Sequence, residues 1–184
     1  TASRLRGRIE AVLAWATVGG YRNGDNPARW KGHLDAVLPK PGRVVKVRHH
    51  RALPIDDVGA FMAELRKREG LSARALEFLV LTAARSGEVR SATWDEIDLE
   101  ARLWTVPGER MKAGREHRVP LSEAAVSLLK ALPRLADSPY VFPSARGRTL
   151  SDMSLSAVMK RMKGDAVPHG FRPTCRYWCA ERTN

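Results

Sequence analysis

The chain is best understood from one stretch near its middle, which reads Leu81-Thr82-Ala83-Ala84-Arg85-Ser86-Gly87-Glu88-Val89. Apolar residues at helical spacing, from Leu76 to Ala83, predict a buried helix that ends just before Arg85. An arginine at the end of a helix can neutralise the helix dipole or pair with Glu88, three residues later. Its guanidinium can also donate two parallel hydrogen bonds to a phosphate. Taken alone, the stretch favours the structural role.

Two later stretches supply residues that suit a phosphate site. Residues 111–115 read Met-Lys-Ala-Gly-Arg, and residues 169–172 read His-Gly-Phe-Arg. With Arg85 they provide two arginines, one lysine and one histidine, a set that can hold a phosphodiester and protonate its leaving oxygen. Neighbouring arginines could substitute for Lys112 as phosphate contacts, and His169 after a proline could be a turn residue. The set contains no nucleophile.

The charge of the chain indicates a polyanionic partner. Its 32 Lys and Arg against 20 Asp and Glu give a formal net charge of +12, and the pI is about 10.5. Residues 1–52 hold 11 basic against 3 acidic residues, whereas the remaining 132 residues hold 21 against 17. A basic pI can also serve solubility alone. The front segment is nevertheless the strongest candidate for electrostatic contact with nucleic acid.

Composition argues against several other classes of protein. The two cysteines, Cys175 and Cys179, are four residues apart on one expected helix and are interpreted as small core residues. The histidines lack the short paired spacings of zinc sites, so we expect no metal. No apolar run approaches the roughly 20 residues that span a bilayer, and no signal peptide is recognisable. We therefore expect a cytoplasmic, nucleoid-associated protein that does not act at a membrane.

The pattern of the chain divides it into three parts. Residues 1–38 predict a helix with an apolar stripe and a basic face, then a second helix over residues 27–37. Two helices cannot enclose a core, so they are interpreted as the end of a helical domain or an appendage. Residues 39–52 are rich in Pro, Gly and basic residues and predict a basic interdomain linker, in which Lys46 and Arg48 are candidate DNA contacts.

Residues 53–184 predict a domain that is mainly α with a small antiparallel β-sheet. One helix is closed by Gly70, and Ser72 is the expected cap of the next. A short turn is expected to hold Glu88. Residues 103–106 and 118–121 predict a pair of strands, with Lys112 at or near the hairpin turn between them. Ser122 begins another helix, residues 140–143 predict a strand, and further helices lie around residues 155–159 and 171–179.

Four motifs follow one another along this domain. They are residues 81–89, Trp94-Asp95-Glu96-Ile97-Asp98, the run from Met111 to Ser122, and His169-Gly170-Phe171-Arg172. In this order and spacing they resemble the catalytic domain of tyrosine recombinases, and more narrowly the phage and prophage integrases of bacteria. The resemblance covers nearly all of residues 53–184. Residues 1–38 resemble the end of the core-binding domain that precedes the catalytic domain in those enzymes.

The resemblance implies a reaction and a role for each residue. In this family a tyrosine hydroxyl attacks a DNA phosphodiester and leaves a 3′-phosphotyrosyl bond and a free 5′-hydroxyl. This hydroxyl later attacks the partner's phosphotyrosine to exchange strands, and no metal or nucleotide cofactor is required. Arg85 and Arg172 would clamp the non-bridging oxygens, and His169 would act as acid or base. Lys112 would protonate the leaving oxygen, and Glu88 would support the site. Arg115 and Arg118 are candidate contacts to backbone phosphates, although water could equally be their partner.

The nucleophile of the family has no counterpart in this sequence, because the motif that carries it comes after the last expected helix. The chain has three tyrosines. Tyr21 lies in the front segment, Tyr140 begins an expected core strand, and Tyr177 is five residues after Arg172, on another side of the same helix. We therefore expect the chain to bind DNA and its scissile phosphate but not to cleave alone.

Two alternatives stay open from the sequence. A type IB topoisomerase uses the same phosphate chemistry without strand exchange, although the Met-Lys-Ala-Gly-Arg segment argues against it. A non-catalytic DNA-binding or regulatory remnant would keep the phosphate residues only as an anion site. The resemblance implies double-stranded DNA with attachment sites as the partner, and a homotetramer on DNA for the full-length protein.

Overall fold

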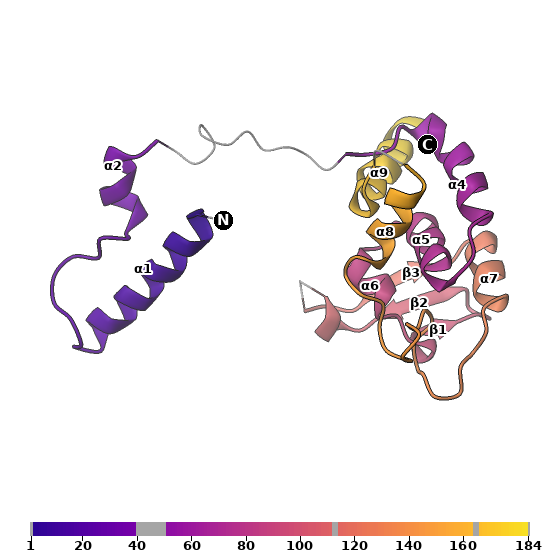
Figure 1. Cartoon of the computed structure of the whole chain (residues 1–184), viewed down its shortest axis with the longest axis horizontal. Coiled ribbons are helices and arrows are strands. Elements are labelled where there is room, and N and C mark those ends of the chain that lie inside the picture. The colour runs from indigo at the N-terminus through magenta and orange to yellow at the C-terminus, as the bar shows by residue number, and fades with distance from the viewer. Residues whose placement is uncertain (1, 40–50, 112–113, 164–165, 184) are drawn as a thin grey trace. The chain divides into compact units, whose positions relative to one another are not determined.

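The structure is a computed structural model that describes residues 2–39, 51–111, 114–163 and 166–183. The chain forms two units, Thr1–His49 and His50–Asn184 (Figure 1). Lys46, Arg48 and Lys112, three of the residues that the sequence proposes for DNA, lie outside the described residues.

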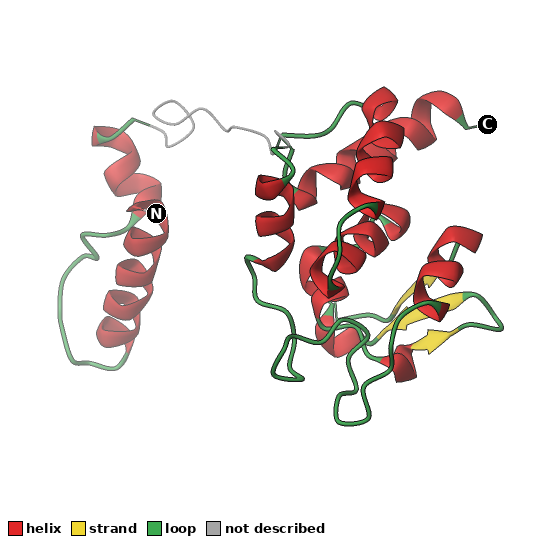
Figure 2. Ribbon diagram, turned by 45° about the vertical axis from the view of Figure 1, so that its right-hand side comes forward, coloured by secondary structure: helices red, strands yellow, loops and turns green. Residues whose placement is uncertain are grey.

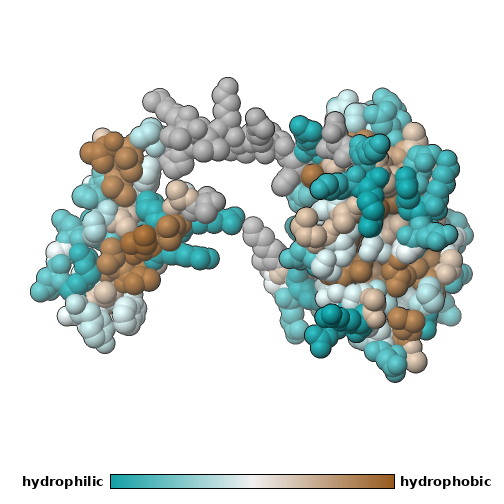
Figure 3. Space-filling model, viewed as in Figure 1, coloured by the Kyte–Doolittle hydropathy of each residue, from teal (hydrophilic) through white to brown (hydrophobic). Residues whose placement is uncertain are grey.

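The smaller unit is built on helix α1 (Ala2–Val18), none of whose residues is buried. The segment after α1 is tied back to it, since Asn26 Nδ2 donates to the carbonyl of Glu10 at 2.8 Å and Arg6 donates to the carbonyl of Ala28 at 2.6 Å. The expected apolar stripe is present but exposed, as the apolar patch over α1 shows (Figure 3).

The second helix expected in this unit, over residues 27–37, is wrong as a single element. The structure has an irregular π-type turn, η1 (Trp30–Leu34), followed by the single turn α2 (Asp35–Val37). Gly32 adopts φ 72° and Lys31 adopts ψ 126°, so the helix is interrupted at this pair. Glycine makes the left-handed conformation accessible and lowers the helix propensity of the segment, which explains the interruption.

The larger unit packs short helices around α5 (Leu71–Thr82). Leu76, Phe78 and Leu79 of α5 are fully buried. The ring of Phe78 lies 5.2 Å from that of Trp104 and 5.6 Å from that of Phe142, so α5 joins the helices to the sheet. The other helices are α4 (Val58–Arg66), α6 (Ser86–Arg90), α7 (Glu123–Lys130), α8 (Ser154–Arg161) and α9 (Phe171–Arg182).

Within the described residues, four single turns of 3₁₀ helix connect these elements. They are η2 (Ile55–Asp57), η3 (Trp94–Glu96), η4 (Gly108–Arg110) and η5 (Pro168–Gly170). The sheet has the order β1 (Ile97–Asp98), β2 (Leu103–Val106) and β3 (His117–Pro120) and is antiparallel throughout. It lies at the end of the unit opposite to α9 (Figure 2).

The β2–β3 pair confirms the predicted hairpin, with Trp104 opposite Val119 and Thr105 opposite Arg118. The strand β1 was not expected. The strand predicted over residues 140–143 is wrong, because the structure has only isolated bridges, from Thr93 to Tyr140 and from Pro143 to Thr149. Pro143 has no backbone N–H to donate to a neighbouring strand, so the bridge from Pro143 to Thr149 does not extend into a β-ladder.

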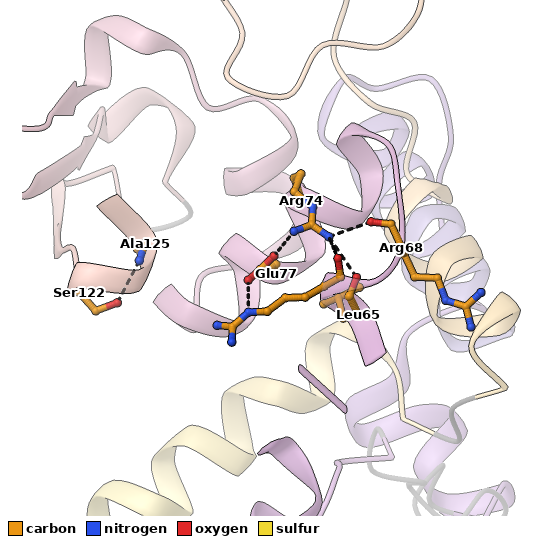
Figure 4. Close-up of polar contacts among 7 residues, drawn as sticks. Leu65, Arg68, Arg74, Glu77, Ser122 and Ala125 are labelled. Atoms are coloured by element: carbon orange, nitrogen blue, oxygen red, sulfur yellow. Dashed lines mark hydrogen bonds and ion pairs between the residues drawn. The ribbon is translucent and has the colours of Figure 1, made fainter. Parts of the chain in front are cut away.

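The junction of α4 and α5 is held by an arginine rather than by a serine cap. Ser72 lies inside α5, and the helix begins after Gly70, which adopts φ 92°. Arg74 donates to three carbonyls at the end of α4 at 2.8–3.1 Å and to the buried carboxylate of Glu77 at 2.7 Å (Figure 4). These bonds satisfy carbonyls that the end of a helix leaves without partners. The Ser122 cap of α7 is confirmed, since its hydroxyl accepts from the amide of Ala125.

The larger unit therefore has the expected fold class, mainly helical with a small antiparallel sheet around one hydrophobic core. The expectation that both cysteines of α9 lie in the core is wrong for Cys179, which is exposed, and Cys175 is only half-buried; Trp178 of the same helix is exposed as well. Among the described residues, the longest helices lack the length and apolar character needed to cross a bilayer.

Candidate functional site

The turn between α5 and α6 presents Arg85 at the surface. Helix α5 ends at Thr82 and is followed by Ala83, which adopts the left-handed conformation with φ 49°, and Arg85 is the extended residue that precedes α6. This reversal places Arg85 at the start of a helix, where backbone amides also favour an anion. The side chain of Arg85 remains 45% exposed, so a ligand from solution can reach it.

Glu88 fixes the conformation of Arg85 from the first turn of α6. One oxygen of its carboxylate accepts the backbone N–H of Arg85 at 2.9 Å, and the other accepts Nη1 of the guanidinium at 2.6 Å. The Glu88 side chain is only 6% exposed, so this pairing takes place largely away from water. The sequence predicts a turn at this position, whereas the structure has the short helix α6, because the carboxylate satisfies the amide that opens the helix.

Arg172 reaches the same turn from the far end of the sequence. It is the second residue of α9, and its Nη1 donates to the carbonyl of Ala83 at 2.7 Å, two residues before Arg85. The structure thus brings together two arginines that are 87 positions apart in the sequence. The described residues around Arg172 form a cavity of about 450 Å³, lined by Ala83, Arg172, Cys175, Arg176, Cys179 and Ala180.

One titratable group in this cavity has a shifted pKa. Burial and then the neighbouring Cys179 thiol raise the pKa of Cys175 above its ordinary value, and the positive charge of Arg172 lowers it to a smaller extent. The Cys175 thiol is therefore neutral beside Arg172 at physiological pH, and does not compete with a phosphate for the guanidinium.

His169 lies in η5, the turn that leads directly into α9. It is exposed, and η5 packs against both α5 and α9. The following residue, Gly170, has no room for a side chain, because a Cβ there would lie 2.2 Å from the carbonyl oxygen of Arg51. Thr174 also donates to the carbonyl of Leu53 at 2.6 Å. The backbone of residues 51–53 therefore fixes the turn that carries His169.

The two remaining candidates that the structure describes, Arg115 and Arg118, are exposed on and just before β3. Arg118 faces Thr105 across the sheet, and its Nε lies 3.9 Å from the carboxylate of Glu116, so it is held only loosely. Both side chains are therefore open to solvent and to a polyanion.

One group near the site was not found by sequence reasoning. Arg110, at the end of η4, forms an ion pair with Glu96 and donates to the backbone carbonyl of Glu88 at 2.7 Å. Glu96 also accepts the indole N–H of Trp104 at 2.9 Å. The only signal in the sequence is one basic and one acidic residue flanking the strand that contains Trp104, and this pattern is too common to identify a pair.

The arrangement offers a defined chemistry. Two guanidinium groups anchored at one turn can bind the oxygens of a phosphate with charge-assisted hydrogen bonds, and a nearby exposed imidazole can transfer a proton. Of the three tyrosines, Tyr21 belongs to the smaller unit, Tyr140 is bridged to Thr93, and Tyr177 is exposed on α9.

Comparisons with known proteins give a consistent result. Residues 51–183 match the phage integrase family, and residues 1–33 match the phage integrase central domain. The chain is 30% identical to the integrase of Enterobacteria phage P4, over 95% of this chain and 43% of that protein. It is 35% identical to the prophage integrase IntZ of Escherichia coli K12, over 94% of this chain and 42% of that protein. The chain thus spans less than half the length of these relatives.

Solved structures share the fold. An integrase of the Tn1549 transposon in complex with a circular intermediate DNA superposes with a TM-score of 0.69, at 16% identity over 97% of this chain and 66% of that chain. A lambda integrase dimer bound to a core site gives a TM-score of 0.66, at 16% identity over 99% of this chain and 67% of that chain. The match of its larger unit, together with these relatives, shows that this chain belongs to the phage integrase family of tyrosine recombinases.

Proposed function

We propose that this chain supplies the phosphate-binding part of a site-specific DNA recombinase that cuts and rejoins strands through a phosphotyrosine. The observation that carries the proposal is the anchoring of Arg172 on the α5–α6 turn, where Glu88 holds Arg85. Arg85 and Arg172 bind the non-bridging oxygens of the scissile phosphate, and His169 acts as acid or base there. Lys112 protonates the leaving 5′-oxygen.

The partner in this proposal is double-stranded DNA carrying attachment sites. The net charge of +12 supports it, as do related folds solved with DNA, among them a lambda integrase tetramer bound to a Holliday junction. Arg115, Arg118, Lys46 and Arg48 contact backbone phosphates. Residues 1–38 form the end of a core-binding domain, residues 39–52 a basic linker, and residues 53–184 the catalytic domain. The full-length protein acts as a tetramer on DNA in the cytoplasm.

The proposal predicts how DNA binding responds to salt. A duplex enriched from a random pool for binding to this chain provides the probe. Replacing both Arg85 and Arg172 with Ala lowers the slope of log affinity against log salt by about one unit, because the two arginines bind the same phosphate. The control is Lys130→Ala, an exposed residue of α7, which leaves the slope unchanged. Equal slopes for the double variant and the wild type would show that Arg85 and Arg172 do not bind a DNA phosphate.

The proposal also states that this chain does not cleave by itself. None of the three tyrosines acts as the nucleophile in this proposal, so an intact or nicked duplex incubated with the chain yields no covalent product in denaturing electrophoresis. A protein–DNA adduct formed by this chain alone would overturn this part of the proposal. In that case the tyrosine responsible is identified by replacing Tyr21, Tyr140 and Tyr177 with Phe one at a time.

A further inference from the structure

Arg110 joins three segments of the larger unit through one side chain. Its Nη1 pairs with the carboxylate of Glu96, and its Nη2 donates to the carbonyl of Glu88 at 2.7 Å and to the hydroxyl of Ser91 at 2.9 Å. The side chain is 25% exposed, so most of it lies within the protein. These bonds connect the end of η4 to η3 and to helix α6.

The carboxylate that receives Arg110 is itself fixed by the core. Glu96 is 6% exposed, and its second oxygen accepts the indole N–H of Trp104 at 2.9 Å. Trp104 is fully buried on β2 and packs against Phe78 of α5. A charge buried to this extent needs its partners, so Glu96 holds the guanidinium of Arg110 beside the strand that carries Trp104.

Helix α6 depends on such outside contacts. It has only five residues, too few to be stable through its own hydrogen bonds. Arg110 binds the backbone of Glu88, and the carboxylate of the same Glu88 binds both the amide and the guanidinium of Arg85. The orientation of Arg85 is therefore coupled through one residue to Arg110 and the sheet.

We propose that Arg110 is a positioning residue for the phosphate site, which holds helix α6 against the sheet so that Arg85 meets the phosphate in the correct orientation. The inference rests on the function proposed above. Arg110 does not touch the phosphate; it acts through Glu88.

The chain contains a matched control for this role. Arg74 is 26% exposed, pairs with Glu77, which is 5% exposed, and donates to three backbone carbonyls (Figure 4). It thus resembles Arg110 in burial and in its bonds. Arg74 is the fourth residue of α5, whereas Arg85 follows the C-terminal end of that helix, and about 12 Å of helix axis separates Arg74 from Thr82. Removing Arg74 costs similar packing without touching α6.

The test compares Arg110→Met with Arg74→Met in the whole chain. Inorganic phosphate is titrated while the side-chain Nε–Hε signal of Arg85 is followed by NMR, at temperatures where each variant is folded to the same extent. In the wild type the Arg85 signal shifts on addition of phosphate. Arg110→Met moves the Arg85 signal before phosphate is added and weakens the apparent affinity about tenfold, because a misdirected donor loses most of its contribution. Arg74→Met changes neither quantity.

Two milder variants keep the test decisive where Arg110→Met does not fold. Ser91→Ala removes one of the three bonds of Arg110, and Arg110→Lys keeps the charge but not the fork that reaches Glu96 and Glu88 together. Both variants shift the Arg85 signal in the same direction as Arg110→Met, by less. The inference is overturned if the Arg110 and Ser91 variants leave the Arg85 signal and the affinity at wild-type values. Failure of the proposed function is a different result, namely a wild-type Arg85 signal that does not respond to phosphate.

Discussion

At the scale of single residues, the site depends on a buried carboxylate. Glu88 is the only acidic partner that the described residues offer to Arg85, and its two oxygens are divided between the backbone and the guanidinium of that arginine. The sequence left open whether Arg85 pairs with Glu88 or binds a phosphate. The geometry is compatible with both, since the guanidinium is paired on one side and still 45% exposed. Glu88 thus acts as a support that orients the arginine.

This arrangement predicts a graded response to substitution of Glu88. Glu88→Ala lowers the free energy of unfolding by about 1–3 kcal/mol, because the amide and the guanidinium of Arg85 both lose a bond. Glu88→Gln costs less, since an amide oxygen can still accept the backbone N–H. Denaturant unfolding of the two variants and the wild type measures whether the free energy of unfolding falls from the wild type to Glu88→Gln and further to Glu88→Ala. Equal midpoints for all three proteins would show that Glu88 does not hold the turn.

At the scale of elements, the turn η5 fits tightly against the segment that enters the larger unit. The position of Gly170 has no room for a side chain. A Cβ added there would lie 2.2 Å from the carbonyl oxygen of Arg51 and 3.0 Å from the Cα of Ala52. Both neighbours are backbone atoms, so neither can rotate away. The position of His169, one residue earlier, therefore depends on this close approach.

Replacing Gly170 with Ala is expected to separate η5 from residues 51–52. The free energy of unfolding falls by about 1–3 kcal/mol, the usual cost of forcing a group into a packed site. Gly59→Ala is the matched control, because Gly59 lies in α4 with no atom within 4 Å of the added Cβ. It raises stability by about 0.5–1 kcal/mol through helix propensity. A Gly170→Ala protein as stable as the wild type would contradict this packing.

The sequence predicted the elements whose pattern is local and strong. Helices α5 and α8 and the β2–β3 hairpin follow directly from apolar periodicity. Helix α6 and strand β1 have five residues and two residues, too few for a period, and are fixed by tertiary contacts. The exposure of Trp178 on α9 could not be predicted either, because an apolar residue at helical spacing looks the same whether or not another element covers it.

The candidate site was predictable only in part, because local motifs reveal some of its residues whereas tertiary contacts determine the others. Arg85 and Arg172 were found from motifs, and the contact of Arg172 with Ala83 joins residues 89 positions apart. Their assignment to catalysis stays a prediction. The role of Arg110 could not be read from the sequence, since it depends on which carbonyl and which carboxylate the folded chain places around one guanidinium.

At the scale of the whole molecule, the buried core lies in the larger unit, whereas more than half of the net charge lies in residues 1–50. Apart from Ala28, the buried apolar residues of the described chain lie in the larger unit. Residues 1–50 contain 10 basic and 3 acidic residues. Deleting these 50 residues is expected to leave the melting temperature of the larger unit unchanged. It weakens DNA binding and reduces its salt dependence, because fewer counterions are released. Calorimetry and a salt series of binding measurements test both parts, and unchanged DNA affinity would contradict the electrostatic role.

The central claim is that Arg85 and Arg172 together bind one DNA phosphate, and it can be tested by removing the charge from the DNA. Each phosphate of a duplex bound by this chain is replaced in turn by a neutral methylphosphonate, and the affinity of the wild type and of Arg172→Ala is measured. We expect one position at which neutralisation weakens the wild type by about tenfold and Arg172→Ala by clearly less, because only Arg85 still binds that phosphate in the variant. If both proteins show the same loss at every position, Arg172 does not bind a phosphate and the account is wrong.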